Sequence, residues 1–357
     1  MDIKKVTADY ETWISARMPL LADDLAAKHQ SMADDPFMFF RATFYAWVER
    51  WTEVCAELAA APQVLSVGDL HVENFGTWRD AEGRVIWGIN DFDEAYPMAY
   101  TNDLVRLAAS ACLAIRQNSL SLEADDACHA IREGYELGME KGGQPWVLSE
   151  QHHWLRALAI DRLKDPGKFW EKMNSFAVVH DTPADVVALL ESHLPERGVS
   201  YRIVHRIAGL GSLGRRRYVA LMDWRGGLVA REAKELAISA CLFQHPVPPG
   251  AQILYPAILA RAVRAPDPFV DLCGNWLIRR LAPDCSRIEL ESLPEERDEA
   301  KLLQAMGWET ANIHLGDPRA ATAIRDDLKQ RGGKKWLAKA AHAMVDTVLE
   351  DWKQWKA

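Results

Sequence analysis

The sequence lacks the features that would assign it to several common classes of protein. No apolar run approaches the roughly 20 residues that a membrane-spanning helix requires. The N-terminal Met-Asp-Ile-Lys-Lys leads into charged, helical sequence rather than the apolar core of a signal peptide. The six cysteines form no Cys-x-x-Cys pair, which argues against a zinc ribbon or a disulfide framework. We therefore expect a cytoplasmic protein with reduced thiols and no membrane partner.

The sequence also has no excess of basic over acidic residues. The formal net charge is -9, which argues against a broad nucleic-acid-binding surface and against nucleic acid as a partner. A local basic groove near Arg215, Arg216 and Arg217 is compatible with that charge. With 357 residues, of which 49% are hydrophobic, the chain is long enough for two lobes or domains.

Hydrophobic periodicity predicts a helical beginning, a β-rich middle and a helical end. Asp35-Pro36 is a typical helix start, and the apolar residues that follow recur at helical spacing. Short apolar runs at 63–67 and 85–89 are typical of strands. Helices are predicted at 8–60, 102–117, 122–141, from Thr182-Pro183 to about Leu194, at 256–264 and over the last sixty residues, and further strands at 201–207, 218–224, 228–233, 275–281 and 287–291.

These elements predict an α+β fold of two lobes rather than a doubly wound sheet, because strands and helices do not alternate regularly. We expect a helical large lobe over 1–145, a helical connector over 146–198 and a β-rich small lobe over 199–295. The C-terminal helices at 296–357 are expected to pack on the large lobe.

Two acidic segments contain the residue types that phosphoryl transfer needs. Such a reaction requires a carboxylate near the attacking hydroxyl, oxygen ligands for magnesium and positive groups around the phosphates. In Gly-Asp-Leu-His-Val-Glu-Asn at 68–74, Asp69 and Asn74 have the spacing of the catalytic Asp and metal-binding Asn of a kinase catalytic loop. Asp91 follows an apolar strand, where its carboxylate can complete a magnesium site. Either motif alone is a common surface turn, so the prediction depends on their order and spacing together.

The segment 68–74 resembles the catalytic loop of aminoglycoside phosphotransferases and related small-molecule kinases, and Ile89–Asp93 resembles their metal-binding segment. Asp103 resembles the Asp that buttresses this loop. Most of residues 30–315 is similar to a bacterial family of unknown function placed in the kinase-like superfamily. The shared motifs are Asp35-Pro36-Phe37, Phe39-Phe40-Arg41, Gly68-Asp69-x-His71-x-x-Asn74-Phe75-Gly76, Asp91-Phe92-Asp93-Glu94, Asp103-Leu104-x-Arg106-Leu107-Ala108 and Gly209-x-Gly211-Ser212-x-Gly214.

The resemblance implies a phosphotransferase that uses ATP and magnesium and acts on a small-molecule or unidentified acceptor. It gives Asp69 the role of catalytic base or of hydroxyl-orienting group. It gives Asn74 and Asp91 the role of magnesium ligands, and it makes Asp93 and Glu94 candidates for a second ion.

A glycine-rich segment, with Gly209, Gly211, Ser212 and Gly214, follows much later in the chain. A dinucleotide-binding glycine loop runs into a helix, whereas this one runs into 215–224, which reads as a strand followed by a tight turn. A Walker loop is excluded because the sequence contains no Gly-Lys-Ser/Thr. The pattern therefore favours a hairpin that covers nucleotide phosphates, as in kinases, with a plain structural hairpin as the alternative.

The lysine that kinases place on the third strand of the small lobe is missing from its expected position. The resembling family shows Lys-Glu-Ala there, and this chain has Arg231-Glu232-Ala233. Lys234 is close, but on a strand its side chain would face away from that of Arg231. Either Arg231 binds the phosphates, although arginine and lysine are not interchangeable, or the chain is an inactive nucleotide-binding or regulatory protein.

The order of the motifs is also unusual, because the glycine-rich segment comes about 140 residues after the catalytic loop. If both assignments hold, the fold is a circularly permuted kinase-like fold. Asp69-x-His71 also occurs in metal-dependent phosphoesterases, but the later Gly-Asn-His motif of those enzymes is missing.

Overall fold

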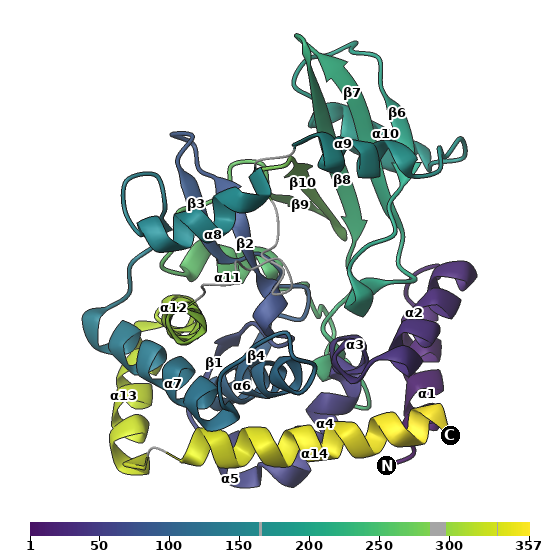
Figure 1. The fold of residues 1–357 in the computed structure, drawn as a ribbon. Coiled ribbons are helices and arrows are strands. Elements are labelled where there is room, and N and C mark those ends of the chain that lie inside the picture. Colours follow the sequence, from purple (N-terminus) through teal and green to yellow (C-terminus); the bar gives the residue numbers. More distant parts are fainter. Residues whose placement is uncertain (164–165, 286–297, 334) are drawn as a thin grey trace.

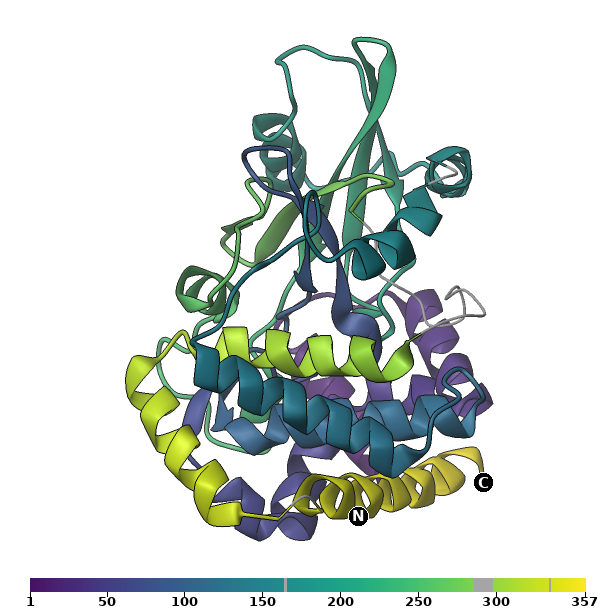
Figure 2. The ribbon, with the colours of Figure 1, turned by 60° about the vertical axis from the view of Figure 1, so that its left-hand side comes forward.

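The computed structural model describes residues 1–163, 166–285, 298–333 and 335–357. It combines helices with strands, as the α+β prediction requires. A helical body contains both ends of the chain, and a five-stranded antiparallel sheet rises from it (Figure 1, Figure 2). Within the described ranges, no helix is long and apolar enough to cross a membrane.

The helical body is assembled from the beginning, the middle and the end of the chain. Its helices are α1 (Ile3–Ser15), α2 (Ala22–Asp34), α3 (Pro36–Ala42), α4 (Phe44–Val54), α5 (Ala56–Ala59), α6 (Tyr100–Arg116), α7 (Ala124–Lys141), α12 (Glu299–His314), α13 (Pro318–Arg331) and α14 (Trp336–Lys356). Helix α6 is almost completely buried and packs against α7 and α14. The region predicted to be helical over 8–60 contains five separate helices, α1 to α5. The predicted helix start at Asp35-Pro36 is confirmed, because Asp35 caps α3 by accepting from Met38 N at 2.8 Å.

Helices α7 and α12 approach each other closely because glycines face the contact. A Cβ at Gly134 would overlap the carbonyl oxygen of Gln304, and a Cβ at Gly307 would overlap that of Ile131. Backbone atoms cannot rotate away from such a clash as a flexible side chain can. Glycine is therefore required where the two helices cross.

Short strands extend from the helical body and carry the two motif loops. Strand β1 (Gln63–Ser66) pairs with β4 (Tyr96–Ala99), while β2 (Phe75–Arg79), β3 (Val85–Ile89) and β5 (Trp146–Val147) form a three-stranded sheet. The predicted strands at 63–67 and 85–89 are confirmed as β1 and β3. Strand β4 was not predicted, because Pro97 argues against a strand; its lost N–H is tolerated in a two-stranded ribbon.

The five-stranded sheet has the order β6-β7-β8-β10-β9. Its strands are β6 (Arg202–His205), β7 (Arg217–Trp224), β8 (Gly227–Glu235), β9 (Asp271–Cys273) and β10 (Trp276–Leu281), and the accompanying helices are α8 (His153–Leu163), α9 (Pro166–Ser175), α10 (Ala184–Ser192) and α11 (Tyr255–Arg261). The predicted strands at 201–207, 218–224, 228–233 and 275–281 are confirmed as β6, β7, β8 and β10. The strand predicted at 287–291 and the boundary drawn at 295 lie outside the described residues.

The two faces of this sheet are covered differently. Val186 and Leu190 of α10 pack on one face, against residues that include Ala233 and Ile278. Met173 of α9 packs on the opposite face, together with Val204, Val219, Leu221 and Ala230. Side chains alternate along β8, so each of its charged residues is committed to one of these two environments.

Candidate functional site

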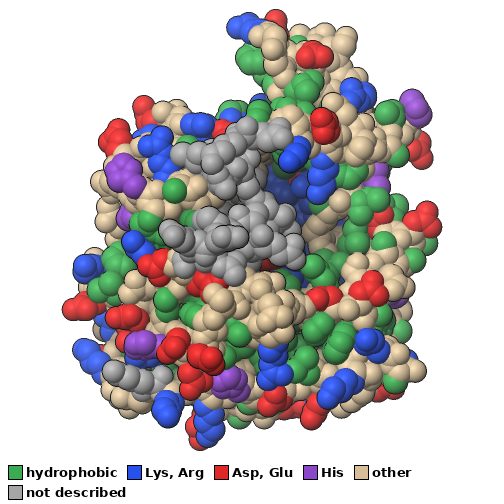
Figure 3. Space-filling model, viewed as in Figure 1, with side chains coloured by type: hydrophobic (Ala, Val, Ile, Leu, Met, Phe, Trp, Pro, Cys, Tyr) green, Lys and Arg blue, Asp and Glu red, His purple; other side chains and the backbone are tan. Residues whose placement is uncertain are grey.

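A cavity of about 810 Å³ lies between the five-stranded sheet and the helical body. Its lining includes Asp69, Asn74, Asp91 and Asp93 from the two motif loops and residues 206–212 of the glycine-rich loop. Cavities of this size are typical of small-molecule and cofactor sites. Figure 3 shows Lys and Arg side chains within the hollow beneath the sheet. The tertiary structure therefore brings together the two sets of predicted site residues, which are far apart in the sequence.

The loop at 68–74 begins at the end of β1 and is held by a buried carboxylate. Gly68 has φ +82°, and a Cβ there would overlap the carbonyl oxygen of Glu94. The carboxylate of Asp103, fully buried in the first turn of α6, accepts from Val67 N at 2.7 Å and from Gly68 N at 3.0 Å. His314 of α12 lies 3.0 Å from the same carboxylate. Asp103 thus has the buttressing contacts that the resemblance implied.

Arg106 fixes the orientation of Asp69. Its Nε donates to Asp69 Oδ1 at 2.9 Å, and its Nη2 makes an ion pair with the same oxygen. The guanidinium is fully buried and lies 4.1 Å from the ring centre of Phe40. Burial raises the pKa of Asp69, while the positive charge of Arg106 opposes that rise.

The second oxygen of Asp69 faces the glycine-rich loop. A Cβ at Gly211 would lie 3.4 Å from Asp69 Oδ2 and 3.2 Å from the carbonyl oxygen of Arg41. The glycine-rich loop therefore comes within van der Waals distance of the loop at 68–74. A side chain at position 211 would fill the space between the two loops.

Asn74 closes the loop at 68–74 from its other end. It lies in a short 3-10 helix, Val72–Asn74, and its Nδ2 donates to the carbonyl oxygen of Asp69 at 2.6 Å. This bond uses the amide nitrogen as the donor. The Oδ1 atom has no hydrogen-bond partner in the part of the chain that the structure describes.

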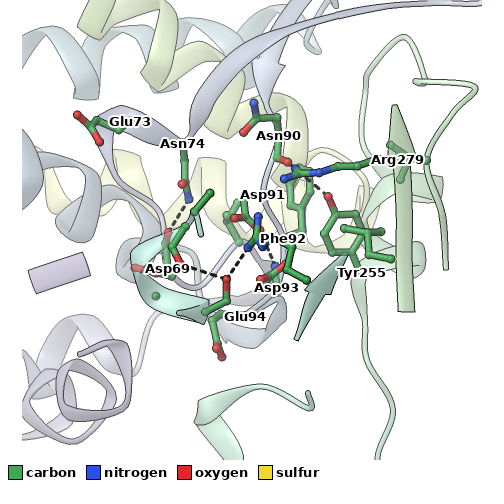
Figure 4. A pocket seen from close by; sticks show the side chains of 18 of the residues that line it. Asp69, Glu73, Asn74, Asn90, Asp91, Phe92, Asp93, Glu94, Tyr255 and Arg279 are labelled. Carbon is green, nitrogen blue, oxygen red and sulfur yellow. Dashed lines mark hydrogen bonds between the residues drawn. The ribbon is translucent and has the colours of Figure 1, made fainter. Parts of the chain in front are cut away.

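Asp91 and Asp93 follow β3 and face Asp69 and Asn74 across the cavity (Figure 4). The Nζ atom of Lys234 lies 3.4 Å from both carboxylate oxygens of Asp91 and makes an ion pair with Asp93. The Oδ1 atom of Asp93 is buried and has no hydrogen-bond partner among the described residues. A buried acceptor without a donor is costly unless a cation or a water satisfies it.

The two carboxyl groups differ in their proton affinity. Burial opposes the ionisation of Asp91, but the charges of Lys234, Arg279 and Arg217 outweigh it and hold its pKa below the ordinary value. Burial raises the pKa of Asp93 to about 7, and the negative charge of Asp91 adds to the increase. Together they form a site that holds a cation best when both are ionised.

Arg231 does not face this site. Its Nε donates to the carbonyl oxygen of His193 at 3.0 Å, and its guanidinium lies 4.9 Å from the ring centre of Phe269. Arg231 pairs with Ala220 across the sheet, on the face that α10 covers, whereas Lys234 pairs with Arg217 on the opposite face. The expectation that Arg231 supplies the phosphate-binding cation is therefore corrected: Lys234 is the strand residue that contacts the two aspartates.

The glycine-rich loop connects β6 to β7, and β7 continues into β8 as an antiparallel hairpin. The predicted hairpin, as opposed to a strand followed by a helix, is thus confirmed. Gly209 has φ +76° and Gly214 has φ +99°, which are conformations that favour glycine. Ser212 Oγ accepts from Arg217 Nη2 at 2.9 Å, and the carbonyl oxygen of Gly214 accepts from Leu21 N at 2.8 Å. The first contact stabilises the loop itself, and the second holds it against the helical body.

A buried glutamate pairs with three arginines behind this loop. This cluster was not predicted from the sequence. Glu232 has no solvent exposure, and it pairs with Arg206 at 2.5 Å, Arg217 at 3.3 Å and Arg279 at 2.5 Å. The pKa of Glu232 is well below its ordinary value, because the three positive charges outweigh its burial. All three arginines line the cavity. A charged residue, Glu232, inside the predicted strand at 228–233 was the available signal.

Glu94, expected as a ligand of a second ion, has other partners. Its Oε2 accepts from Ala240 N at 2.6 Å, and its Oε1 lies 3.6 Å from the Arg215 guanidinium. Burial raises the pKa of Glu94, and Arg215 opposes the rise. Glu94 therefore connects the segment after β3 to the loop after β8.

Comparison with known proteins gives one finding. No curated protein matches the chain, and no solved structure matches it. Residues 20–177 match a family described as "Uncharacterized protein conserved in bacteria (DUF2252)". The match includes both motif loops and ends before the glycine-rich loop. It supports the resemblance to a bacterial family without an assigned activity, whereas the kinase-like relationship stays a prediction.

Proposed function

We propose that this chain is a phosphotransferase that uses ATP and magnesium, with a circularly permuted kinase-like arrangement of its two lobes. One observation supports it most directly. Asp69, Asn74, Asp91 and the glycine-rich loop line a single cavity, although the sequence separates them widely. Those are the residue types that phosphoryl transfer requires.

The donor set fits magnesium. Asp93 Oδ1 is a buried acceptor without a donor among the described residues, and the side chain of Asp91 is 37% exposed toward the cavity. Together with Asn74 Oδ1, these atoms are the hard oxygen ligands that magnesium prefers. We propose that Asn74, Asp91 and Asp93 hold the ion, which would neutralise charge on the phosphates. Lys234 would keep the two carboxylates in place.

The remaining residues have separate roles in the proposal. Arg217 and Arg279 donate to Glu232 and retain further N–H groups for phosphate oxygens, since each guanidinium has five donors. Gly209 and Gly211 allow the loop backbone to lie close over the phosphates. Asp69 orients the acceptor hydroxyl through Oδ2 and receives its proton, while Arg106 holds Oδ1.

An inactive nucleotide-binding protein is the second candidate, and the Arg106 contact is the observation that favours it. A guanidinium that pairs with Oδ1 of Asp69 lowers the basicity of that carboxylate. Arg231 no longer supports this candidate, because Lys234 contacts Asp91 and Asp93.

Nucleotide binding and transfer test the proposal in two steps. We expect ATP to raise the melting temperature only when magnesium is present, and Asp91→Ala to abolish the increase. Asp223→Ala, an exposed position on β7, is the matched control and should retain it. Label from the γ-phosphate but not the α-phosphate of ATP should then appear on an acceptor in a small-molecule screen. Binding without any transfer would favour the inactive protein, and no binding by the folded protein would refute both candidates.

A further inference from the structure

A second group of metal-ligand side chains lies on the other face of the sheet, where α10 meets the edge strand β9. His193, directly after α10, and Asp271 and Cys273 of β9 place one ligand atom each within 4.8 Å of one another. The His193 Nε2 atom lies 3.3 Å from Asp271 Oδ2, and the Cys273 Sγ atom lies 3.4 Å from the same oxygen. None of these residues has a role in the proposed phosphotransfer, although Asp271 also lines the wall of that cavity.

Sheet geometry explains why these side chains meet. Asp271 and Cys273 are two residues apart on one strand, so both side chains point to the same face. Cys273 pairs with Trp276 and Asp271 pairs with Ile278, both of which contribute to the apolar cluster that α10 covers. His193, at the end of α10, therefore lies on the same face of the sheet as the side chains of Asp271 and Cys273.

The tautomer of His193 is set for binding a cation. Its Nδ1 lies 2.9 Å from the carbonyl oxygen of Leu189 and 3.0 Å from Ser192 Oγ. The Ser192 hydroxyl donates its own proton to the Leu189 carbonyl oxygen at 2.7 Å, so both neighbours of Nδ1 act as acceptors and Nδ1 carries a proton. In the neutral ring, Nε2 is then an acceptor that faces the carboxylate of Asp271, also an acceptor. A proton or a metal ion between them resolves this contact. Metal-binding histidines commonly donate their other ring N–H to a carbonyl oxygen in this way.

Two of the three distances between ligand atoms, those to Asp271 Oδ2, fit a small tetrahedral metal site. Zinc binds nitrogen and oxygen at about 2.0–2.2 Å and sulfur at about 2.3 Å, which places the ligand atoms of a tetrahedron roughly 3.4–3.6 Å apart. The measured 3.3 and 3.4 Å are close to those values. A salt bridge between protonated His193 and Asp271 would account for the first contact. It would not explain why the Cys273 thiol lies beside the same carboxylate oxygen.

We propose that His193, Asp271 and Cys273 bind a zinc ion, with a fourth position open to water. Imidazole, thiolate and carboxylate together suit zinc better than magnesium or calcium, which prefer oxygen ligands alone. The ion would tie the end of α10 to the exposed edge of the sheet. Asp271 also lines the large cavity, so the ion would fix part of its wall. This inference does not depend on the proposed phosphotransferase activity.

Cobalt, which replaces zinc and is coloured, tests the site in the whole protein without nucleotide. We expect one Co²⁺ per chain, with a near-ultraviolet thiolate-to-cobalt charge-transfer band that added Zn²⁺ removes. Cys273→Ser should abolish the band, and His193→Gln should weaken binding while leaving the thiol in place. Cys285→Ser, which changes another partly exposed cysteine, is the matched control and should retain the band.

Each variant is first melted in EDTA to confirm that it folds. A band that persists in Cys273→Ser, or its disappearance in Cys285→Ser, would overturn the assignment. Absence of cobalt and zinc binding by the folded parent protein would also overturn it. Magnesium should neither produce nor remove the band, which separates this site from the proposed phosphotransfer site.

Discussion

Replacing Lys234 by methionine is the sharpest test of how the cavity is organised. The substitution removes the ammonium group but keeps a long unbranched side chain. The side chain of Lys234 is 1% exposed, and its Nζ contacts both Asp91 and Asp93. Removing one partner from a buried ion pair costs about 3–5 kcal/mol, because the remaining charge is left uncompensated.

Arg231→Met is the matched control, since the two residues lie three positions apart on opposite faces of β8. Arg231 loses two hydrogen bonds to carbonyl oxygens, those of His193 and Ala230, and a contact with an aromatic ring. Each is worth about 0.5–1 kcal/mol, so we expect a total loss of about 1.5–3 kcal/mol, smaller than that of Lys234→Met. Urea unfolding of the two variants measures the difference directly, and only Lys234→Met should lose magnesium-dependent ATP binding.

The stability that Lys234→Met loses relative to the parent protein should depend on pH in a defined direction. Asp93 already has a pKa of about 7, and the loss of Lys234 raises it further. In this pH range the folded variant therefore binds a proton at Asp93 that the unfolded variant does not bind. Its loss of stability relative to the parent protein should shrink as the pH falls from 8 to 6. Equal losses in Lys234→Met and Arg231→Met, or a deficit that does not change with pH, would refute the reasoning.

Three further changes test the surroundings of the site. Burial raises the pKa of Glu309 to about 7, so the free energy of unfolding should fall as the pH rises from about 4.5 to 7; Glu309→Gln should flatten this slope in urea titrations at several pH values. Asp103→Asn leaves a backbone N–H of Val67 or Gly68 facing an amide donor and should cost about 2–4 kcal/mol, against no change for the exposed Asp346→Asn. Gly307→Ala should lower the free energy of unfolding by at least about 2 kcal/mol, because its Cβ meets a backbone carbonyl of α7. Gly227→Ala, where nothing lies within 4 Å, should be neutral, and equal losses at both glycines would contradict the packing argument.

Local patterns in the sequence determined the elements that carry the site. The apolar runs that became β1 and β3 place Asp69 and Asp91 directly after strands, and the Gly-Gly turn fixed the β7–β8 hairpin. These features depend on neighbouring residues, so periodicity and turn chemistry suffice to predict them. The spacing of Asp69 and Asn74 likewise predicted residues that now share a hydrogen bond.

Only the tertiary structure decided which of two alternating cations faces the cavity. The sequence implies that Arg231 and Lys234 point in opposite directions, but not which face α10 covers. The Arg106–Asp69 pair, the arginines around Glu232 and the meeting of His193 with Asp271 and Cys273 also depend on long-range packing. Contacts of this kind join residues tens to hundreds of positions apart, and no local periodicity encodes them.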